Sequence, residues 1–226
     1  MIADNLERVR ARIAAACRAA GRDVQSVTLL VVSKRFGPDA VRAAASADAR
    51  CFGENHVQEA LEKMNALGDL SGMVEWHLIG PLQSNKTRVV AERFDWVQSV
   101  DRLKIAERLS AQRPATLAPL SVCLQVNVSG ETTKSGVAPD ELEPLARAVA
   151  RLPRLRLRGL MSIPAPVQGF DAQRAPHRAL RRLQEALVRQ GLALDTLSMG
   201  MSDDLEAAIA EGSTMVRVGT AVFGSR

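Results

Sequence analysis

The sequence contains no tyrosine, and aromatic residues make up only 3% of its 226 residues. Stacking surfaces for single-stranded nucleic acid depend on aromatic side chains, so they are scarce here. The three cysteines, Cys17, Cys51 and Cys123, are odd in number and widely spaced. They predict neither a disulfide framework nor a metal-ligand cluster, and we expect no metal. A reducing compartment, the cytoplasm, fits this cysteine content best.

Long apolar runs are missing as well, and no stretch is long enough to span a bilayer. The first 20 residues carry Asp4 and Glu7 within an arginine-rich pattern, which is not typical of a secretory signal or a transit peptide. With 46% hydrophobic residues and a mean hydropathy of -0.04, the chain is expected to be a soluble globular protein without a membrane partner.

The net charge is +5 and the pI is about 9.6, which raises the question of nucleic-acid binding. The arginines are scattered and balanced locally by acidic residues, and no zinc finger, RNP motif or basic arm is present. We therefore expect a solvated basic surface and no nucleic-acid partner. Such a surface can still attract phosphorylated small molecules.

Short apolar runs alternate with longer amphipathic ones along the whole chain. Strands are predicted at 27–33, 50–53, 74–79, 95–98, 121–128, 156–161, 194–198 and 214–218. Helices are predicted at 3–20, 38–48, 55–67, 84–93, 101–112, 139–152, 172–191 and 203–212. Glycines 21 and 191 are expected to stop helices, and prolines 38, 139 and 176 to lie at or near helix starts.

Eight strands alternating with helices, without flexible linkers, predict a single α/β domain over 1–226. The count fits a (β/α)8 TIM-type barrel with an extra N-terminal helix, which we expect to cover the gap left where the chain ends after the last strand. A doubly wound parallel sheet is the alternative, but no G-x-G-x-x-G follows the first strand.

Lys34 ends the apolar run 27–33, which is typical of a strand buried on both faces. A strand-end lysine is ordinarily solvated, because its stem reaches water. If Lys34 enters a cleft instead, desolvation favours the neutral amine, which attacks aldehydes to form a Schiff base. In a barrel the strand C-termini meet at one mouth. The residues at or just past predicted strand ends are Lys34, Asn55, His77, Asn127, Met161, Ser198 and Arg217.

The last two strands are followed by loops that in barrel enzymes commonly bind phosphate. Ser202 suits a helix N-cap, and it can equally hold a phosphate together with Ser198 and backbone N–H groups. Arg217 lies between two valines, so alternation points it inward, toward a ligand or a structural salt bridge. Gly219 allows close approach of a ligand, and Thr220 adds a hydroxyl group.

The middle segments are less informative. Asn55 either caps a helix or touches a ligand. His77 is more typical of a core or loop histidine than of a catalyst, and the three histidines lack zinc-site spacing.

Several motifs together resemble the pyridoxal phosphate homeostasis protein family, whose fold is similar to the N-terminal barrel of alanine racemase. They span nearly the whole chain: VSK at 32–34, FGEN at 52–55, VQE at 57–59, WHLIGPLQSNK at 76–86, GLM at 159–161, LSMGMSDD at 197–204, VRVGT at 216–220 and FG at 223–224. Two departures are visible, because His56 stands where the family often has tyrosine and Arg35 follows the lysine.

The resemblance implies that Lys34 carries pyridoxal 5′-phosphate (PLP) as an internal aldimine. It implies that Arg217 faces the pyridine nitrogen. It also implies that Ser202, Gly219 and Thr220 hold the phosphate, with Ser198 and Asn55 nearby. Arginine only donates hydrogen bonds, so the ring nitrogen would stay unprotonated and carbanion chemistry would be weak.

Alanine racemase takes its second acid/base, a tyrosine, from a C-terminal domain, and this chain has neither. His56 or His77 would have to substitute. We therefore predict a carrier that buffers, delivers or protects PLP without robust catalysis, as a monomer or weak dimer, with apo PLP-dependent enzymes as candidate recipients. The alternatives are a PLP-dependent racemase or related amino-acid enzyme, and a cofactor-free Schiff-base aldolase using Lys34.

Overall fold

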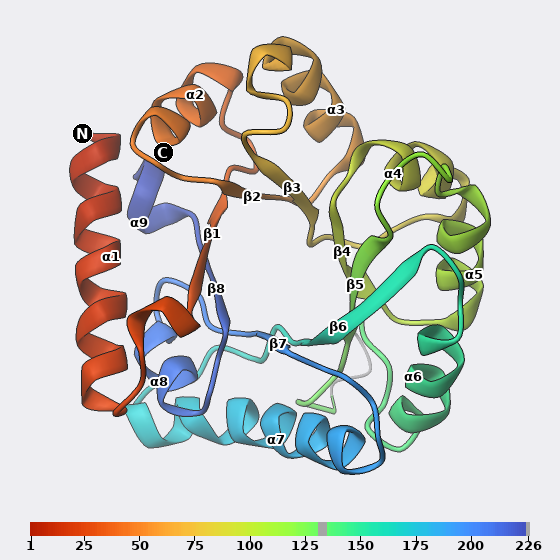
Figure 1. Ribbon diagram of the computed structural model, residues 1–226. Helices are drawn as coiled ribbons and strands as arrows, with labels where there is room; N and C mark the ends of the chain where they lie inside the picture. The colour runs from red at the N-terminus through yellow and green to blue at the C-terminus, as the bar shows by residue number, and fades with distance from the viewer. Residues whose placement is uncertain (131–134, 225–226) are drawn as a thin grey trace.

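The computed structural model describes residues 1–130 and 135–224, which form a closed barrel of eight strands (Figure 1). Each strand is parallel to its neighbours, and β8 pairs with β1 to close the ring. The strands are β1 Thr28–Val32, β2 Cys51–Glu54, β3 Glu75–Leu78, β4 Trp96–Val100, β5 Leu120–Gln125, β6 Leu155–Met161, β7 Thr196–Ser198 and β8 Met215–Val218. The predicted (β/α)8 barrel is confirmed, and all eight predicted strands are present.

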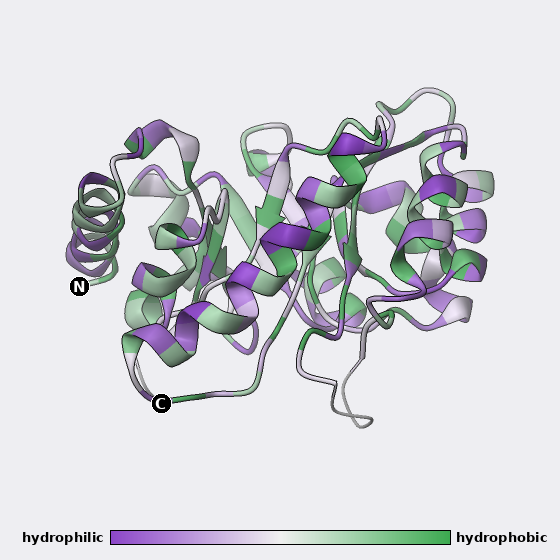
Figure 2. Ribbon diagram, turned by 90° about the horizontal axis from the view of Figure 1, so that it is seen from below, coloured by the Kyte–Doolittle hydropathy of each residue, from purple (hydrophilic) through white to green (hydrophobic). Residues whose placement is uncertain are grey.

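Helices surround the barrel, and their ribbons alternate polar and apolar bands in Figure 2, because one face of each helix packs on the sheet. They are α1 Ile2–Ala19, α2 Pro38–Ser46, α3 Val57–Ala66, α4 Thr87–Arg93, α5 Leu103–Gln112, α6 Leu142–Ala150, α7 Phe170–Arg189, α8 Leu205–Ala210 and α9 Thr220–Phe223. Among the described residues, no helix combines the length and apolarity needed to cross a membrane.

The N-terminal helix α1 lies outside the ring, beside α2, α8 and α9 (Figure 1). Its apolar face buries Leu6, Val9 and Ile13. The Asn5 side-chain amide donates to the Val222 carbonyl over 2.7 Å and ties α1 to the last helix. The expected covering role of α1 is thus confirmed.

The helices differ from the sequence expectation at α7 and α9, and several others begin or end a few residues away from their predicted bounds. Pro176 lies inside α7, six residues after the helix begins, and not near its start. The buried face formed by His177, Leu180 and Leu187 outweighs the one hydrogen bond that a proline removes. The short α9 was not predicted, because four residues show no periodicity.

Apolar residues are buried in two layers, which is typical of a barrel. Outward-facing strand residues such as Val31, Phe52 and Leu78 pack under the helices in one large core. Inside the barrel, two smaller clusters comprise Leu30, Val32, Ile79 and Met215, and Trp96, Cys123 and Met161. Hydrogen bonds also join the buried polar side chains of His77, Gln98, Ser198 and Arg217 inside the barrel.

Candidate functional site

A cavity of about 770 Å³ opens at the C-terminal ends of the strands. Six of the seven site residues predicted from the sequence line it: Lys34, Asn55, Ser202, Arg217, Gly219 and Thr220. The seventh, Ser198, is fully buried in the barrel interior and is not among the lining residues. The structure therefore brings residues from both ends of the chain to one place.

Lys34 sits in a tight turn directly after β1. The Phe36 backbone N–H donates to the Ser33 carbonyl over 3.0 Å and closes this turn. Arg35, inside the turn, has a φ of +65°. A side-chain-bearing residue in this left-handed region is strained, so the surrounding structure must hold the turn in place.

A buried ion cluster holds it. The Lys63 ammonium donates to the Ser33 carbonyl over 2.7 Å and to Glu54 Oε1 over 2.6 Å. It also donates to Glu59 Oε1 over 2.8 Å, and this oxygen accepts from the Arg35 backbone N–H. The Ser33 hydroxyl donates to Glu54 over 2.6 Å. The backbone on both sides of Lys34 is thus fixed by charged groups.

Sequence reasoning missed the role of Lys63, which is only 3% exposed. A lysine on the buried face of a helix, four residues after Glu59, is a signal for such a cluster, because an unpaired lysine is almost never buried. The partner Glu54 comes from the end of β2, and this contact depends on the fold.

Arg217 projects inward from β8, as the valine alternation predicted. Its guanidinium donates to the Ser198 hydroxyl over 2.8 Å and to the Ser162 carbonyl over 2.7 Å. Burial lowers the pKa of Arg217 to about 10, although the Asp204 charge opposes this shift. The group therefore remains a cation at neutral pH. Both bonded oxygens are neutral, so they position the charge without cancelling it.

The loop after β7 is shaped by Asp204. Its Oδ1 accepts from the Met201 backbone N–H over 2.6 Å, and its Oδ2 pairs with His177 Nε2 over 2.9 Å. Asp204 is the N-cap residue of α8, so the expectation that Ser202 caps this helix is wrong. The reason is that α8 begins later than predicted, which leaves Ser202 at the cavity wall.

Gly219 allows the ends of β8 and β1 to lie in contact. A Cβ atom at this position would be 2.9 Å from the Val32 carbonyl oxygen, closer than real contacts allow. Gly219 is also the N-cap of α9, so the N–H groups around Thr220 have no partner within the helix. These donors and the Thr220 hydroxyl line the cavity beside the turn that carries Lys34.

Asn55 lines the cavity from the end of β2, the strand next to β1. Gly80 makes this possible, because a Cβ there would be 2.2 Å from the Asn55 carbonyl oxygen. The Ser99 hydroxyl holds the Gly80 carbonyl over 2.6 Å. The loop after β3 therefore packs directly on Asn55.

Neither histidine that could replace the missing tyrosine lines the cavity. His56 is exposed at the start of α3. His77 is fully buried in the barrel interior, where it stacks on Trp96 and its Nδ1 lies 2.9 Å from Gln98 Nε2. Burial lowers the pKa of His77 despite the neighbouring Glu75, so its imidazole is neutral.

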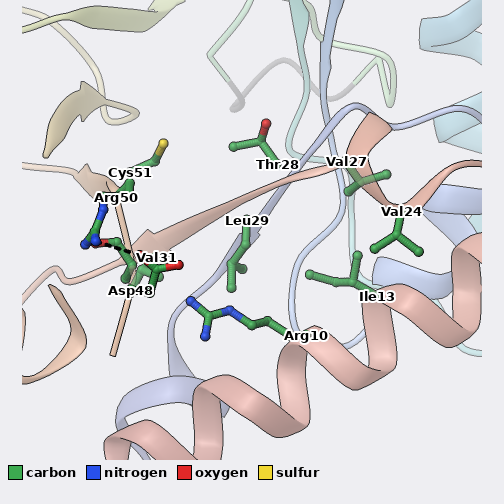
Figure 3. Close-up of a pocket in the computed structure, with 11 residues that line it drawn as sticks. Arg10, Ile13, Val24, Val27, Thr28, Leu29, Val31, Asp48, Arg50 and Cys51 are labelled. Carbon is green, nitrogen blue, oxygen red and sulfur yellow. Dashed lines mark hydrogen bonds and ion pairs between the residues drawn. The ribbon is translucent and has the colours of Figure 1, made fainter. Parts of the chain in front are cut away.

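A second cavity, of about 300 Å³, lies between α1 and the N-terminal ends of β1 and β2 (Figure 3). Its charged residues are already engaged: Arg10 donates to the Ala47 carbonyl, and Arg50 pairs with Asp48. Polar groups do not converge here as they do at the mouth.

The sequence profile described as "Alanine racemase, N-terminal domain" matches residues 5–226. The pyridoxal phosphate homeostasis protein of Pseudomonas aeruginosa is 62% identical over 225 residues, covering 100% of this chain and 96% of the relative. The Escherichia coli K12 protein of the same name is 53% identical over 226 residues, covering 100% and 97%.

Solved structures agree with these relatives. PipY of Synechococcus elongatus with PLP bound is 38% identical, with a TM-score of 0.87, and the match covers 99% of this chain and 100% of PipY. Alanine racemase of Corynebacterium glutamicum is 20% identical, with a TM-score of 0.71 over 61% of its length, and shows a shared fold alone. The resemblance read from the motifs is confirmed, and this chain belongs to the pyridoxal phosphate homeostasis protein family.

Proposed function

We propose that this protein binds pyridoxal 5′-phosphate at the barrel mouth and serves PLP homeostasis by buffering, delivering or protecting the cofactor. The observation that carries the proposal is the shared cavity, where Lys34, the buried Arg217 and the start of α9 meet. The names of the curated relatives and the PLP bound to PipY support it.

The donors at the mouth fit this cofactor group by group. The Lys34 amine suits covalent attachment of an aldehyde. The backbone donors around Thr220, its hydroxyl and the Ser202 hydroxyl suit a phosphate. The Arg217 guanidinium suits the acceptor nitrogen of a pyridine ring. Asn55, at the end of β2, would contact the ring, and Ser198 would act through Arg217.

Bound PLP supplies an electron sink, and the protein residues decide how strong this sink is. Arg217 remains protonated and donates only, so beside the ring nitrogen it would keep that atom as an acceptor without a proton. The Ser198 hydroxyl and the Ser162 carbonyl hold the guanidinium in the barrel interior for this role. The arrangement favours binding over carbanion chemistry.

Among the residues that the structure describes, neither a tyrosine nor a histidine lines the cavity as a second acid/base for a racemase. The chain has no tyrosine, and His56 and His77 lie elsewhere. Among the described lining residues, Asp203 is the one carboxylic acid, and it belongs to the same loop as Ser202, which would hold the phosphate. We therefore propose a cytoplasmic carrier, a monomer or weak dimer without a nucleic-acid partner, whose recipients are apo PLP-dependent enzymes.

Cofactor attachment is tested by absorbance and borohydride reduction. Purified protein mixed with PLP is expected to turn yellow, and reduction followed by peptide mass spectrometry should locate the cofactor on Lys34. K34A should lose the colour. K104A, which removes an exposed lysine of α5, is the matched control and should keep it. A colourless wild-type protein after reconstitution contradicts the proposal.

The carrier role is tested by transfer from loaded protein to a dilute apo-enzyme, compared with free PLP at equal concentration. Faster or better-protected activation from the loaded protein is expected. Equal rates contradict delivery. Racemisation of alanine at enzyme-like rates, lost in K34A, would favour the racemase.

A further inference from the structure

Three side chains with metal-binding donors meet at the N-terminal end of the barrel, opposite the mouth. They are Cys51, Glu75 and His77, and their donor atoms all lie within 4.8 Å of one another. Glu75 Oε2 is 3.7 Å from Cys51 Sγ and 3.6 Å from His77 Nε2. None of the three lines the mouth cavity.

Strand register produces this cluster. Cys51 of β2 pairs directly with Glu75 of β3, and His77 follows two residues later on the same face of β3. In Figure 3 the Cys51 thiol points away from α1, on the side of the sheet opposite Leu29. The three donors therefore face the barrel interior. The sequence expectation of no metal cluster missed them, because strand pairing and not sequence spacing joins them.

His77 points an unused nitrogen at this cluster. The side chain is 0% exposed, and its Nε2 is buried without a hydrogen-bond partner among the residues that the structure describes. Leaving a buried polar atom unpaired is costly, so such an atom calls for an explanation. The other ring nitrogen, Nδ1, lies 2.9 Å from the Gln98 amide, which fixes the plane of the ring.

We propose that Cys51, Glu75 and His77 bind one divalent cation of the Zn²⁺ class, with water as the fourth ligand. Tetrahedral zinc with bonds of about 2.0–2.3 Å separates its ligands by about 3.3–3.8 Å. Two of the separations already match this range. A thiolate, an imidazole and a carboxylate select Zn²⁺ over Mg²⁺ or Ca²⁺.

Metal binding changes where the protons of Cys51 and His77 reside. The Cys51 thiol releases its proton to water, and the thiolate sulfur donates an electron pair to the metal. The metal takes the Nε2 lone pair of His77, so the imidazole proton resides on Nδ1. The Gln98 amide, rotated by half a turn, accepts that proton through its oxygen, as the partners of metal-bound histidines do. Its oxygen now accepts from the Ser198 hydroxyl, and after the rotation its Nε2 donates to that hydroxyl instead. Glu75 is 57% exposed, which gives the cation a path from solvent.

The test is titration of the full chain with Co²⁺ and displacement by Zn²⁺. We expect one Co²⁺ per chain, a sulfur-to-cobalt charge-transfer band in the near ultraviolet, and loss of the band when Zn²⁺ is added. C51A should abolish the band, and C51A and E75Q should each weaken Zn²⁺ binding at least tenfold. C123A is the matched control, because it removes another interior cysteine outside the cluster and should bind normally.

Folding is checked through the rise in melting temperature on Zn²⁺ addition, expected in wild type and C123A but not in C51A. The same titration in K34A excludes chelation by the cofactor, and it should match wild type. The metal proposal does not depend on PLP. Zn²⁺ binding measured in K34A and PLP binding measured in C51A therefore show which of the two proposals fails. Absence of the charge-transfer band, or equal Zn²⁺ affinity in C51A and wild type, overturns it.

Discussion

The two sides of the barrel mouth are built by different means. On the β1–β2 side, the turn around Lys34 is held by buried charges, with Lys63 between Glu54 and Glu59. On the β7–β8 side, the loops are shaped by backbone contacts and by one carboxylate, Asp204. The first side presents the Lys34 amine, and the second presents N–H and hydroxyl donors.

This difference follows from what each side has to hold. An amine that forms a covalent bond needs a fixed position, and a strained turn keeps that position only when strong contacts surround it. A phosphate is recognised by several weak donors that a loop backbone provides without charged side chains. Substitutions on the two sides are therefore expected to fail in different ways.

The largest effect is expected for K63M. It leaves Glu54 buried without its cation, and breaking a buried pair in this way costs about 3–5 kcal/mol. Urea unfolding should show this loss, together with weaker binding of both PLP and pyridoxal. K104M, at an exposed site, is the control. Adding E54Q to K63M should restore part of the stability. A loss below about 1 kcal/mol for K63M would show that the cluster is not what holds the turn.

A smaller and more selective effect is expected for D204A. It removes the bonds to Met201 N–H and His177 and should cost about 2 kcal/mol of stability. PLP affinity should fall more than pyridoxal affinity, because the phosphate side is disturbed. D203A is the stability control, because Asp203 accepts a hydrogen bond from the Gln173 amide through its backbone carbonyl, which the substitution keeps. Equal losses for both ligands would erase the contrast with K63M.

Acid should loosen the segment between β7 and β8 through two carboxylates, Asp204 in the mouth loop and Glu211 at the C-terminal end of α8. Burial favours the neutral acid in each, but hydrogen bonds outweigh it. The pKa of Asp204 is lowered by His177 and Met201 N–H, and that of Glu211 by Arg178 and Arg174. Since both folded values lie below the unfolded ones, their contribution to stability is complete above about pH 4.5 and is lost as the pH falls through the folded values.

The free energy of unfolding, measured between about pH 6 and 2, should decrease as the pH falls. D204N and E211Q should each make this decrease smaller. D171N, which alters a carboxyl that is 93% exposed, should leave it unchanged. If both variants keep the pH dependence of the wild type, groups other than Asp204 and Glu211 cause the acid sensitivity.

The smallest change in the free energy of unfolding is expected for R35G, which should stabilise the protein. Glycine relieves a left-handed φ that costs about 1–2 kcal/mol for other residues, but it adds freedom to the unfolded chain. The net gain should be about 0.5–1 kcal/mol by urea unfolding. R151G, where φ is -90°, is the control and should not stabilise. A destabilised R35G would mean that the arginine side chain itself holds the turn.

Periodicity predicted all eight strands and the barrel, because parallel buried strands have strong apolar runs. Motifs likewise predicted that Lys34 and Arg217 belong to one site at the barrel mouth. What the sequence could not provide was contact between elements: the Glu54–Lys63 pair joins β2 to α3, and the Cys51–Glu75 pair joins β2 to β3. Such pairs depend on strand register and helix packing, which no local pattern encodes. The short α9 and the late start of α8 were not predicted, because a segment of only a few residues shows no periodicity.

The pairing of β1 with β8 has a consequence for synthesis. Leu30 lies opposite Arg217, so the strand that presents Lys34 finds one of its two neighbours only when the last segment of the chain has been made. A nascent chain that stops before β8 has the amine, but its first strand keeps an open edge and its mouth lacks the guanidinium and the α9 donors. Ligand capture at the mouth would therefore require that the chain has been made through β8 and α9.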